Sequence, residues 1–409
     1  MLTVQEALQQ ILNNTSLQQL QSSRNETVSL LSARNRVLGE DQIATIDVPP
    51  WDNSAMDGYA LNTADLVNGS SLPVSQVIPA GKFPQPLQAG TAARIFTGAP
   101  IPSGANAVEM QENTQKENDR VTFLQKVKPG ANIRHRGEDI ENNSVVVKAG
   151  MILQAPHLGL LASVGIAKVP VKKLLRVAVV STGDELADPS NKEPGEKLKD
   201  GQIYNSNRYL LLGLLQQLGF ETVDGGMIAD DVRLTKQRLL QLSEQSDVII
   251  SSGGVSVGEE DHVKAALEAI GKLNLWKIAV KPGKPLAFGS INHTTFFGLP
   301  GNPVSAFVTF LVFVKPYLLK AQGATQLEPQ LLEAIADFDW PPVKQGKERK
   351  PIQREEYLRA RLKQDGKTVE IYPNQSSGAL SSVVWANGLA IAPIGAVISR
   401  GDKIKVLML

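Results

Sequence analysis

A glycine- and serine-rich stretch, Ser251-Ser-Gly-Gly-Val-Ser-Val-Gly-Glu-Glu-Asp261, has the composition of an anion-binding turn. It follows Asp247-Val-Ile-Ile250, an unbroken apolar and β-branched run that is typical of a buried parallel strand. It precedes residues 262–270, whose apolar side chains have helical spacing. The stretch is therefore predicted to join a strand to the start of a helix, where free backbone N–H groups bind anions.

Individual residues of this turn carry groups that could contact a ligand. Gly253 and Gly254 permit positive φ and a close approach of the backbone to a ligand. Ser252 and Ser256 add hydroxyl groups. Asp261 stands at the expected N-cap of the helix, where its carboxylate could cap the helix or bind a metal. Taken alone, the stretch is also compatible with a plain structural turn.

Three further polar turns that contain glycine each follow a predicted strand in the same part of the chain. Between about residues 174 and 323, strands and helices alternate as in a doubly wound, mostly parallel α/β domain. Ligands bind such domains outside the carboxyl ends of the strands. Four such turns therefore predict a ligand site at this edge. The three turns are Ser181-Thr-Gly-Asp-Glu185, Lys281-Pro-Gly-Lys-Pro285 and Pro300-Gly-Asn-Pro303, the last contributing Pro300, Gly301 and Pro303.

Acids and lysines accompany these turns. Carboxylates bind Mg²⁺, which commonly bridges to substrate phosphates, and lysines neutralise oxyanions. The chain has no GxxxxGK[ST] and no GxGxxG after the first strand of this domain, which argues against a P-loop NTPase and a dinucleotide site. The residues predict a phosphorylated or nucleotide-like ligand and a divalent metal, and they allow for a second anion. The acids are Glu185, Asp230 and Asp261, and the lysines are Lys277, Lys281 and Lys284.

Composition narrows the class of protein. The chain has 409 residues, of which 42% are hydrophobic and 20% charged, as in ordinary globular proteins. A net charge of +1 gives no bulk electrostatic reason to bind nucleic acid or an anionic membrane. The absence of cysteine excludes disulfides and thiol chemistry, so a metal is expected to have oxygen ligands. The longest apolar stretch, 304–314, is shorter than the roughly 20 residues of a membrane span. We expect a cytoplasmic protein.

A chain of this length is too long for one ordinary hydrophobic core, so several domains are expected. The alternating strands and helices of residues 174–323, with stretches of short strands on either side, predict a multidomain α/β protein. Short strands divided by glycine and proline indicate a small β domain, and alternating short strands near the C-terminus indicate a β-barrel-like domain. Helices are expected at 4–12, 28–38 and 156–164, and they either mediate dimerisation or only cap their domain. The expected domains are 1–45 with 140–173 (helical dimerisation), 46–139 (small β), 174–323 (α/β) and 324–409 (C-terminal barrel).

Seven motifs occur in an order that resembles the molybdopterin molybdenumtransferases, which include bacterial MoeA and the E-domain of gephyrin. The resemblance extends from the N-terminal helices to the C-terminal barrel and is weakest in the barrel. The motifs are Asp52-Asn-Ser-Ala-Met-Asp-Gly-Tyr59, Phe96-Thr-Gly-Ala-Pro100, Arg136-Gly-Glu-Asp139, Ser181-Thr-Gly-Asp-Glu-Leu186, Ser251-Ser-Gly-Gly-Val-Ser-Val-Gly258, Val280-Lys-Pro-Gly-Lys-Pro285 and Gly298-Leu-Pro-Gly-Asn-Pro303.

The resemblance implies a reaction in molybdenum cofactor biosynthesis: adenylylated molybdopterin and molybdate give molybdenum cofactor and AMP, with Mg²⁺. It implies functional roles for Asp57 and Thr97 of the small β domain. It likewise implies roles for Glu185, Asp230, Lys277 and Lys281, with Asp261 as the foremost Mg²⁺ ligand beside Glu185 and Asp230. The residues that resemble the molybdate site are Lys281, Lys284, Arg359 and Ser377.

The resemblance further implies a homodimer with each active site shared between subunits. It implies a molybdopterin adenylyltransferase and molybdoenzyme chaperones as partners. Two alternative functions stay open at this point. One is a molybdopterin adenylyltransferase, against which the extra domains and Asp57 argue. The other is a gephyrin-like scaffold, which is disfavoured because this chain lacks gephyrin's second enzyme domain and long linker.

Overall fold

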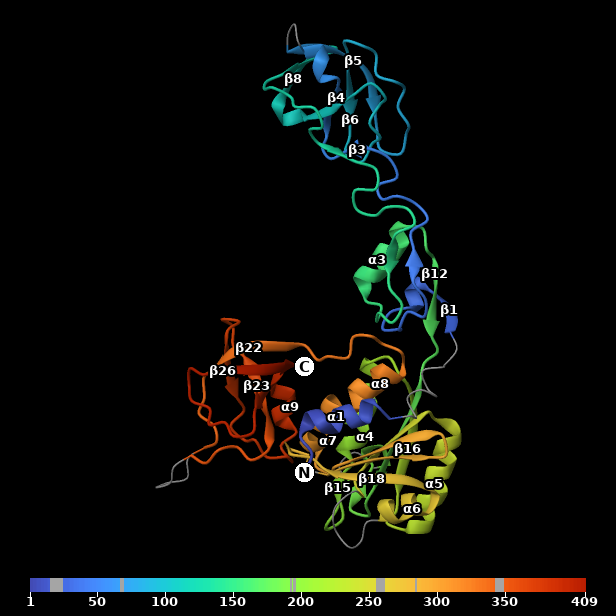
Figure 1. Cartoon of the computed structure of the whole chain (residues 1–409), viewed down its shortest axis with the longest axis vertical. Coiled ribbons are helices and arrows are strands. Elements are labelled where there is room, and N and C mark those ends of the chain that lie inside the picture. Colours follow the sequence, from blue (N-terminus) through green and yellow to red (C-terminus); the bar gives the residue numbers. More distant parts are fainter. Residues whose placement is uncertain are drawn as a thin grey trace.

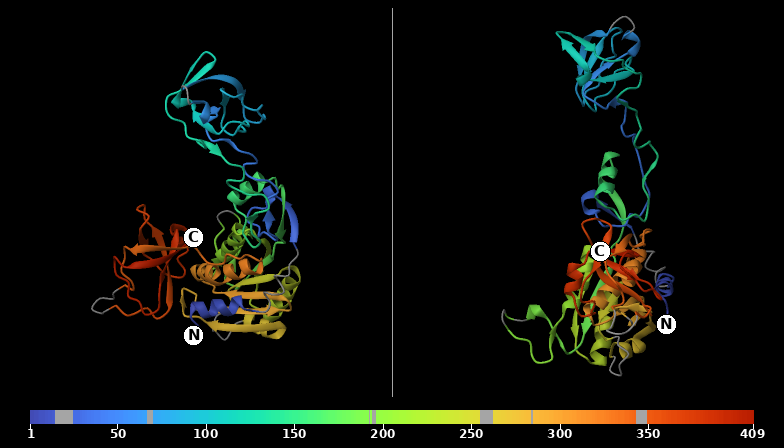
Figure 2. Two further views of the ribbon diagram at one scale, coloured as in Figure 1. Left: turned by 45° about the horizontal axis from the view of Figure 1, so that its top comes forward. Right: turned by 90° about the vertical axis from the view of Figure 1, so that its left-hand side faces the viewer.

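The computed structural model describes all 409 residues except 15–24, 67–69, 192, 194–195, 255–261, 284 and 343–348, and except the side chains of residues 275 and 276. The molecule is elongated (Figures 1 and 2). A small β domain lies at one end, and a unit containing α3 and β12 lies next to it. The α/β domain lies at the other end, with the C-terminal domain at its side.

The α/β domain has a six-stranded sheet, and the predicted mostly parallel, doubly wound arrangement is confirmed. Four neighbouring strands are parallel, and the last two are antiparallel. Helices cover both faces of the sheet, and each face forms a separate apolar cluster with its helices. The strand order is β16 (Glu221–Ile228), β13 (Arg176–Thr182), β17 (Val248–Ser252), β21 (Thr294–Leu299), β20 (Pro285–Ile291) and β18 (Gly271–Lys277).

The two faces of this sheet differ in their helices. One face packs on α5 (Val232–Gln245) and α6 (His262–Ile270). The other packs on α4 (Ser206–Gln217) and on a long helix made of α7 (Pro303–Thr309), a π-helical segment (Phe310–Val314) and α8 (Lys315–Ala321). By length and composition the helix Pro303–Ala321 could cross a membrane, but 83% of it is buried in this domain, as in a core helix. Short strands β14 (Leu186–Ala187) and β15 (Ile203–Tyr204) and the 3-10 turn Pro189–Asn191 complete the domain.

The predicted helical first domain is wrong in two respects. Residues 28–38 are not a helix: β1 (Asn25–Ser29) pairs with β12 (Lys168–Lys172), followed by a 3-10 turn (Leu30–Ser32). Val28 is β-branched and pairs with Val169, and Asn35 has a φ of 62°, which an α-helix cannot contain.

The N-terminal helix is the second correction to the expected first domain. The predicted helix α1 (Val4–Leu12) forms, with the Thr3–Glu6 capping box. However, Val4, Ala7 and Ile11 pack into the core of the α/β domain and not against α3 (Ala155–Ser163). The apolar face of α1 therefore already has a partner within the chain. The unit around α3 is completed by β1, β12, β2 (Gln42–Ile43) and β11 (Val145–Val147).

The small β domain contains a six-stranded mixed sheet, as the glycine- and proline-divided pattern predicts. Two chain segments join it to the α3 unit, and they are linked by the Val48–Ile140 bridge and the Arg136–Asp47 ion pair. The strand order is β7 (Ala107–Met110), β4 (Gly58–Leu61), β6 (Ala92–Ile95), β5 (Ser71–Ile78), β9 (Arg120–Phe123) and β8 (Thr114–Glu117). The pair β3 (Asn53–Ser54) and β10 (Ile133–Arg134) and the 3-10 turns Thr63–Leu66 and Gln111–Asn113 complete it.

The C-terminal domain is a closed five-stranded barrel, so the predicted barrel is confirmed. The ring is closed because its first strand, β23, also pairs with its last strand, β25. A short strand of the α/β domain, β19 (Val280–Lys281), adds to β23 in parallel. The ring consists of β23 (Glu355–Leu362), β24 (Thr368–Ile371), β22 (Leu331–Ala336), β26 (Lys403–Met408) and β25 (Gly388–Ala392), with α9 (Ser381–Trp385) beside it.

We predict that Phe297→Ala destabilises the α/β domain by about 3–5 kcal/mol, the usual cost of removing a buried phenylalanine. Phe297 is fully buried and packs edge-on against Phe288 and Tyr317, at centroid distances of 5.0 and 5.1 Å. Scanning calorimetry should show an earlier unfolding transition. The matched control is Phe83→Ala, because Phe83 is 72% exposed in the small β domain. Equal effects of the two substitutions on the α/β transition would contradict the assignment of Phe297 to its core.

Candidate functional site

The turns at the carboxyl ends of β13, β17 and β21 lie side by side, and one buried side chain joins the turns after β17 and β21. The Asn207 amide, at the start of α4, donates to Ser252 Oγ at 2.7 Å and to the Gly301 carbonyl at 2.6 Å. The backbone N–H of Gly253 donates to the Leu299 carbonyl. The two predicted ligand-binding turns that contain Ser252 and Gly301 therefore form one edge.

Glycine is required at both described glycine positions, 253 and 254, of the glycine- and serine-rich turn after β17. Gly253 has a φ of 95°, and a Cβ there would lie 2.9 Å from the Thr182 carbonyl oxygen. Gly254 has a φ of 65°, and a Cβ there would lie 2.2 Å from a methyl group of Val263. Because L side chains rarely adopt such φ values, any substitution would move the backbone. The predicted site residues Ser256, Asp261 and Lys284 lie outside the described residues.

Several buried polar atoms at this edge have unused hydrogen-bonding capacity. Within the described part of the chain, Thr182 Oγ1, Asn205 Nδ2 and Asn207 Oδ1 have no partner. All three residues lie at strand ends or at the start of α4, next to the glycine turns. Buried polar atoms are nearly always hydrogen-bonded in folded proteins. The edge therefore has donors and acceptors available for a polar ligand.

Two of the three predicted metal-binding acids are described. Asp184 and Asp230 hold their two turns together, since each carboxylate accepts from the other's backbone N–H, at 3.0 and 3.3 Å. Glu185 is exposed, and its carboxylate folds back over Gly183. Among the residues with described placement, no group of three His, Asp or Glu is arranged to hold a metal. The exposed oxygens of Glu185 and Asp230 still suit a hard cation such as Mg²⁺.

Of the predicted lysines, Lys281 lies where the α/β domain meets the barrel. Lys281 Nζ forms an ion pair with Glu356 Oε1 at 3.0 Å and keeps 45% of its side-chain surface exposed. The other oxygen of Glu356 accepts from Trp340 Nε1. Lys277, at the end of β18, is exposed. Lys281 can therefore reach an oxyanion in solvent while Glu356 restricts its position.

Arg359 is fully enclosed, and its three guanidinium nitrogens donate within the barrel. They donate to Ser382 Oγ, to the Tyr357 carbonyl and to the Ser376 carbonyl, at 3.1, 3.1 and 3.3 Å. Burial lowers the pKa of Arg359 to about 10. The adjacent Ser377 carbonyl accepts from the backbone N–H of Val304, one residue after the Pro300–Pro303 turn. The barrel loop that contains Ser377 is thus attached to the candidate site.

Asp57 and Thr97 form a compact pair in the small β domain. The backbone N–H and the hydroxyl of Thr97 both donate to Asp57 Oδ1 at 2.8 Å. These two hydrogen bonds hold the pKa of Asp57 below its usual range. Within one chain the α3 unit separates this pair from the α/β domain (Figures 1 and 2). The structure therefore brings the α/β and barrel residues together but leaves Asp57 and Thr97 apart from them.

Two residues of the candidate site, Asn207 and Glu356, were not predicted from the sequence. Asn207 joins two turns, and its only signal was an asparagine in the first turn of a helix that follows a polar loop. Glu356 pairs with Lys281 across a domain boundary, 75 residues apart in sequence. No local pattern predicts such a long-range contact.

Family profiles match nearly the whole chain. Residues 2–165 match the MoeA N-terminal region (domains I and II), and residues 345–409 match the MoeA C-terminal region (domain IV). Residues 178–320 match the probable molybdopterin binding domain. This last match covers all four turns of the candidate site, so the fold and the site define a protein of the molybdopterin-binding class.

Full-length relatives identify the family. The molybdopterin molybdenumtransferase of Haemophilus influenzae is 45% identical over 320 residues, 78% of either chain. The protein of the same name from Nostoc sp. is 37% identical over 399 residues, 94% of this chain and 88% of the relative. The crystal structure of the molybdopterin biosynthesis MoeA protein from Pyrococcus horikoshii superposes with a TM-score of 0.81 and 30% identity over all of both chains. The chain belongs to the molybdopterin molybdenumtransferase family.

We predict that Thr97→Val raises the pKa of Asp57 part of the way to its ordinary value. The substitution removes the hydroxyl donor but keeps the backbone N–H, which contributes more to the lowering. Carbon-13 NMR titration of the Asp57 carboxyl in both proteins measures the change. Thr91→Val serves as the control, because its hydroxyl bonds Ser75 and Gln88 in the same domain. An unchanged Asp57 titration in Thr97→Val would refute the proposed coupling.

Proposed function

We propose that the protein inserts molybdate into adenylylated molybdopterin, giving molybdenum cofactor and AMP in a Mg²⁺-dependent reaction. The observation that carries this proposal is the edge of glycine turns with unused buried polar atoms, inside the region that matches the molybdopterin-binding profile. Such an edge suits a ligand with phosphate groups, because backbone N–H groups and hydroxyls can bind phosphate oxygens directly.

Each group of residues has a proposed task in this reaction. The turns at Ser252–Gly254, with Ser256, and at Pro300, Gly301 and Pro303 bind the phosphates and orient the dithiolene-bearing ligand. Glu185, Asp230 and Asp261 hold Mg²⁺, which offsets negative charge on the phosphates when bound. Lys277, Lys281 and Lys284 supply positive charge toward molybdate. Arg359 acts indirectly, since its donors are engaged in holding the loop that contains Ser377.

Measurement of AMP release tests the proposal. The purified chain is supplied with adenylylated molybdopterin and Mg²⁺, with and without molybdate. Molybdate-dependent AMP release supports the transferase function. Consumption of ATP with unmodified molybdopterin would instead support an adenylyltransferase, and no turnover of either substrate would favour a scaffold. Cytoplasmic location and contacts with a molybdopterin adenylyltransferase and molybdoenzyme chaperones belong to the same proposal.

We predict that Lys281→Ala raises the half-saturating concentration of molybdate about 10- to 100-fold and leaves AMP binding unchanged. The reason is the loss of one charge-assisted contact, worth roughly 1.5–3 kcal/mol. Steady-state AMP release against molybdate concentration measures the effect. Lys367→Ala is the matched control, because Lys367 is an exposed barrel lysine. Unaltered molybdate saturation in Lys281→Ala would remove this lysine from the oxyanion site.

We also propose a homodimer in which each active site draws on two chains. The support is geometric: Asp57 and Thr97 lie at one end of an elongated chain, and the glycine turns lie at the other (Figure 1). A twofold axis would let the small β domain of one subunit approach the α/β domain of its partner, giving two equivalent sites.

Complementation tests this arrangement. Asp57→Ala and Asp261→Ala are each expected to be inactive. After the two are unfolded, mixed and refolded, a mixed dimer has one site with both substitutions and one site with neither. With random pairing about half of the dimers are mixed, so about a quarter of wild-type activity should return. Tagged subunits confirm that mixed dimers form, and their inactivity would show that each site belongs to one chain.

A further inference from the structure

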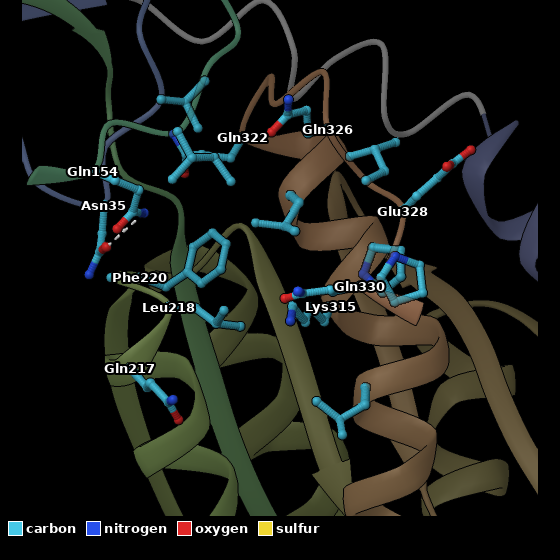
Figure 3. A pocket seen from close by; sticks show the side chains of 18 of the residues that line it. Asn35, Gln154, Gln217, Leu218, Phe220, Lys315, Gln322, Gln326, Glu328 and Gln330 are labelled. Carbon is cyan, nitrogen blue, oxygen red and sulfur yellow. Dashed lines mark hydrogen bonds between the residues drawn. The ribbon is translucent and has the colours of Figure 1, made fainter. Parts of the chain in front are cut away.

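A second cavity lies far from the candidate site, at the junction of three domains (Figure 3). Its volume is about 440 Å³, within the range of small-molecule sites. Leu174 lies two residues before β13 and Phe220 one residue before β16, so the cavity lies at the amino ends of these parallel strands. The glycine turns lie at their carboxyl ends. The cavity is therefore separate from the candidate site at the glycine turns.

The walls of the cavity come from separate parts of the chain. Phe220, Leu218 and Leu311 form an apolar wall on the α/β domain. Amide side chains approach from the other units, including Gln154 from the α3 unit and Gln330 from the segment that leads into the barrel. An occupant would therefore contact all three units at once. Such mixed apolar and amide walls suit a ligand with an apolar body and a polar end.

Lys315 gives the cavity its charge preference. It begins α8, directly after the π-helical segment, and its side chain is half-buried and lines the cavity beside Gln330 (Figure 3). Within the described part of the chain its ammonium group has no hydrogen bond or ion pair. Burial, with no compensating anion, lowers the pKa of Lys315. Glu328 also lines the cavity, but it is exposed and forms no ion pair with Lys315 in the described structure.

We propose that this cavity binds a small organic carboxylate, whose anionic end pairs with Lys315 and whose apolar body packs on Phe220 and Leu311. A half-buried cation without a partner is energetically unfavourable, and a bound carboxylate would supply the missing charge. The apolar wall that includes Phe220 and Leu311 favours a carboxylate with a short apolar tail over inorganic anions. The site is independent of the proposed transferase reaction.

Calorimetric titration of the full-length chain with octanoate, hexanoate and benzoate tests the proposal. We expect that at least one of these carboxylates binds saturably. Octylamine, which has an apolar tail but the opposite charge, should not bind. Lys315→Met should weaken binding about tenfold or more, because it keeps the side-chain length but removes the charge. Gln330→Trp should also weaken binding, because the larger side chain fills the cavity while the charge of Lys315 is kept. Lys236→Met, on the exposed face of α5, should bind like the wild type.

Hydrogen exchange adds a readout of location. Octanoate should protect the backbone amides of residues 326–328 and 330, and this protection should be absent in Lys315→Met. Three results would overturn the proposal: no saturable binding of any carboxylate, equal binding of octylamine, or unchanged affinity in both Lys315→Met and Gln330→Trp. Loss of molybdate-dependent AMP release has no bearing on this outcome, so the two proposals fail separately.

Discussion

Parallel pairing of β13, β17 and β21 is the constraint on which the candidate site depends. In this register Ser181 lies beside Ser252, and Ser252 lies beside Leu299, so the three strands end at one level. Their following turns must then share one edge of the sheet. Asn207 converts this proximity into contact, because a single amide donates to both Ser252 and Gly301. Close packing at the edge in turn excludes any side chain larger than glycine at position 254.

The barrel depends on the same edge, although it has its own apolar core. Strand β19 leaves the α/β domain and pairs with β23, which brings Lys281 opposite Glu356. A second link joins the Val304 N–H to the Ser377 carbonyl. Two of the four turns are therefore attached to the barrel. Arg359 stabilises this arrangement from inside, because its buried guanidinium holds the loop on which Ser377 lies.

Local sequence patterns predicted most strands and helices of the α/β domain, but few of the contacts between this domain and the other parts of the chain. The unbroken apolar run ending at Ile250 forms a strand buried on both faces, and the polar turns after such strands do lie together. A helix was wrongly predicted for residues 28–38 because their apolar residues have helical spacing. Pairing of Val28 with Val169 places the start of this segment in a strand instead. Contacts such as Lys281–Glu356 and the packing of Ile11 on the α/β core join distant segments. Periodicity contains no information about such partners.

The small β domain that contains Asp57 is joined to the α3 unit by hydrogen bonds and a small apolar cluster, and not by a large shared core. Two segments connect the small β domain to the α3 unit, and the Asp47 carboxylate accepts from the Arg136 side chain and from the backbone of Asn142 across them. Ile140 and Val48, one from each connecting segment, pack into a small apolar cluster of the α3 unit that includes Val164. The apolar contacts of this connection come from Val48 and Ile140, so we expect reorientation of the small β domain about it to cost little. Two hydrogen bonds hold Thr97 against Asp57 within the small β domain, and the two-segment connection sets where this pair lies relative to the candidate site of the same chain.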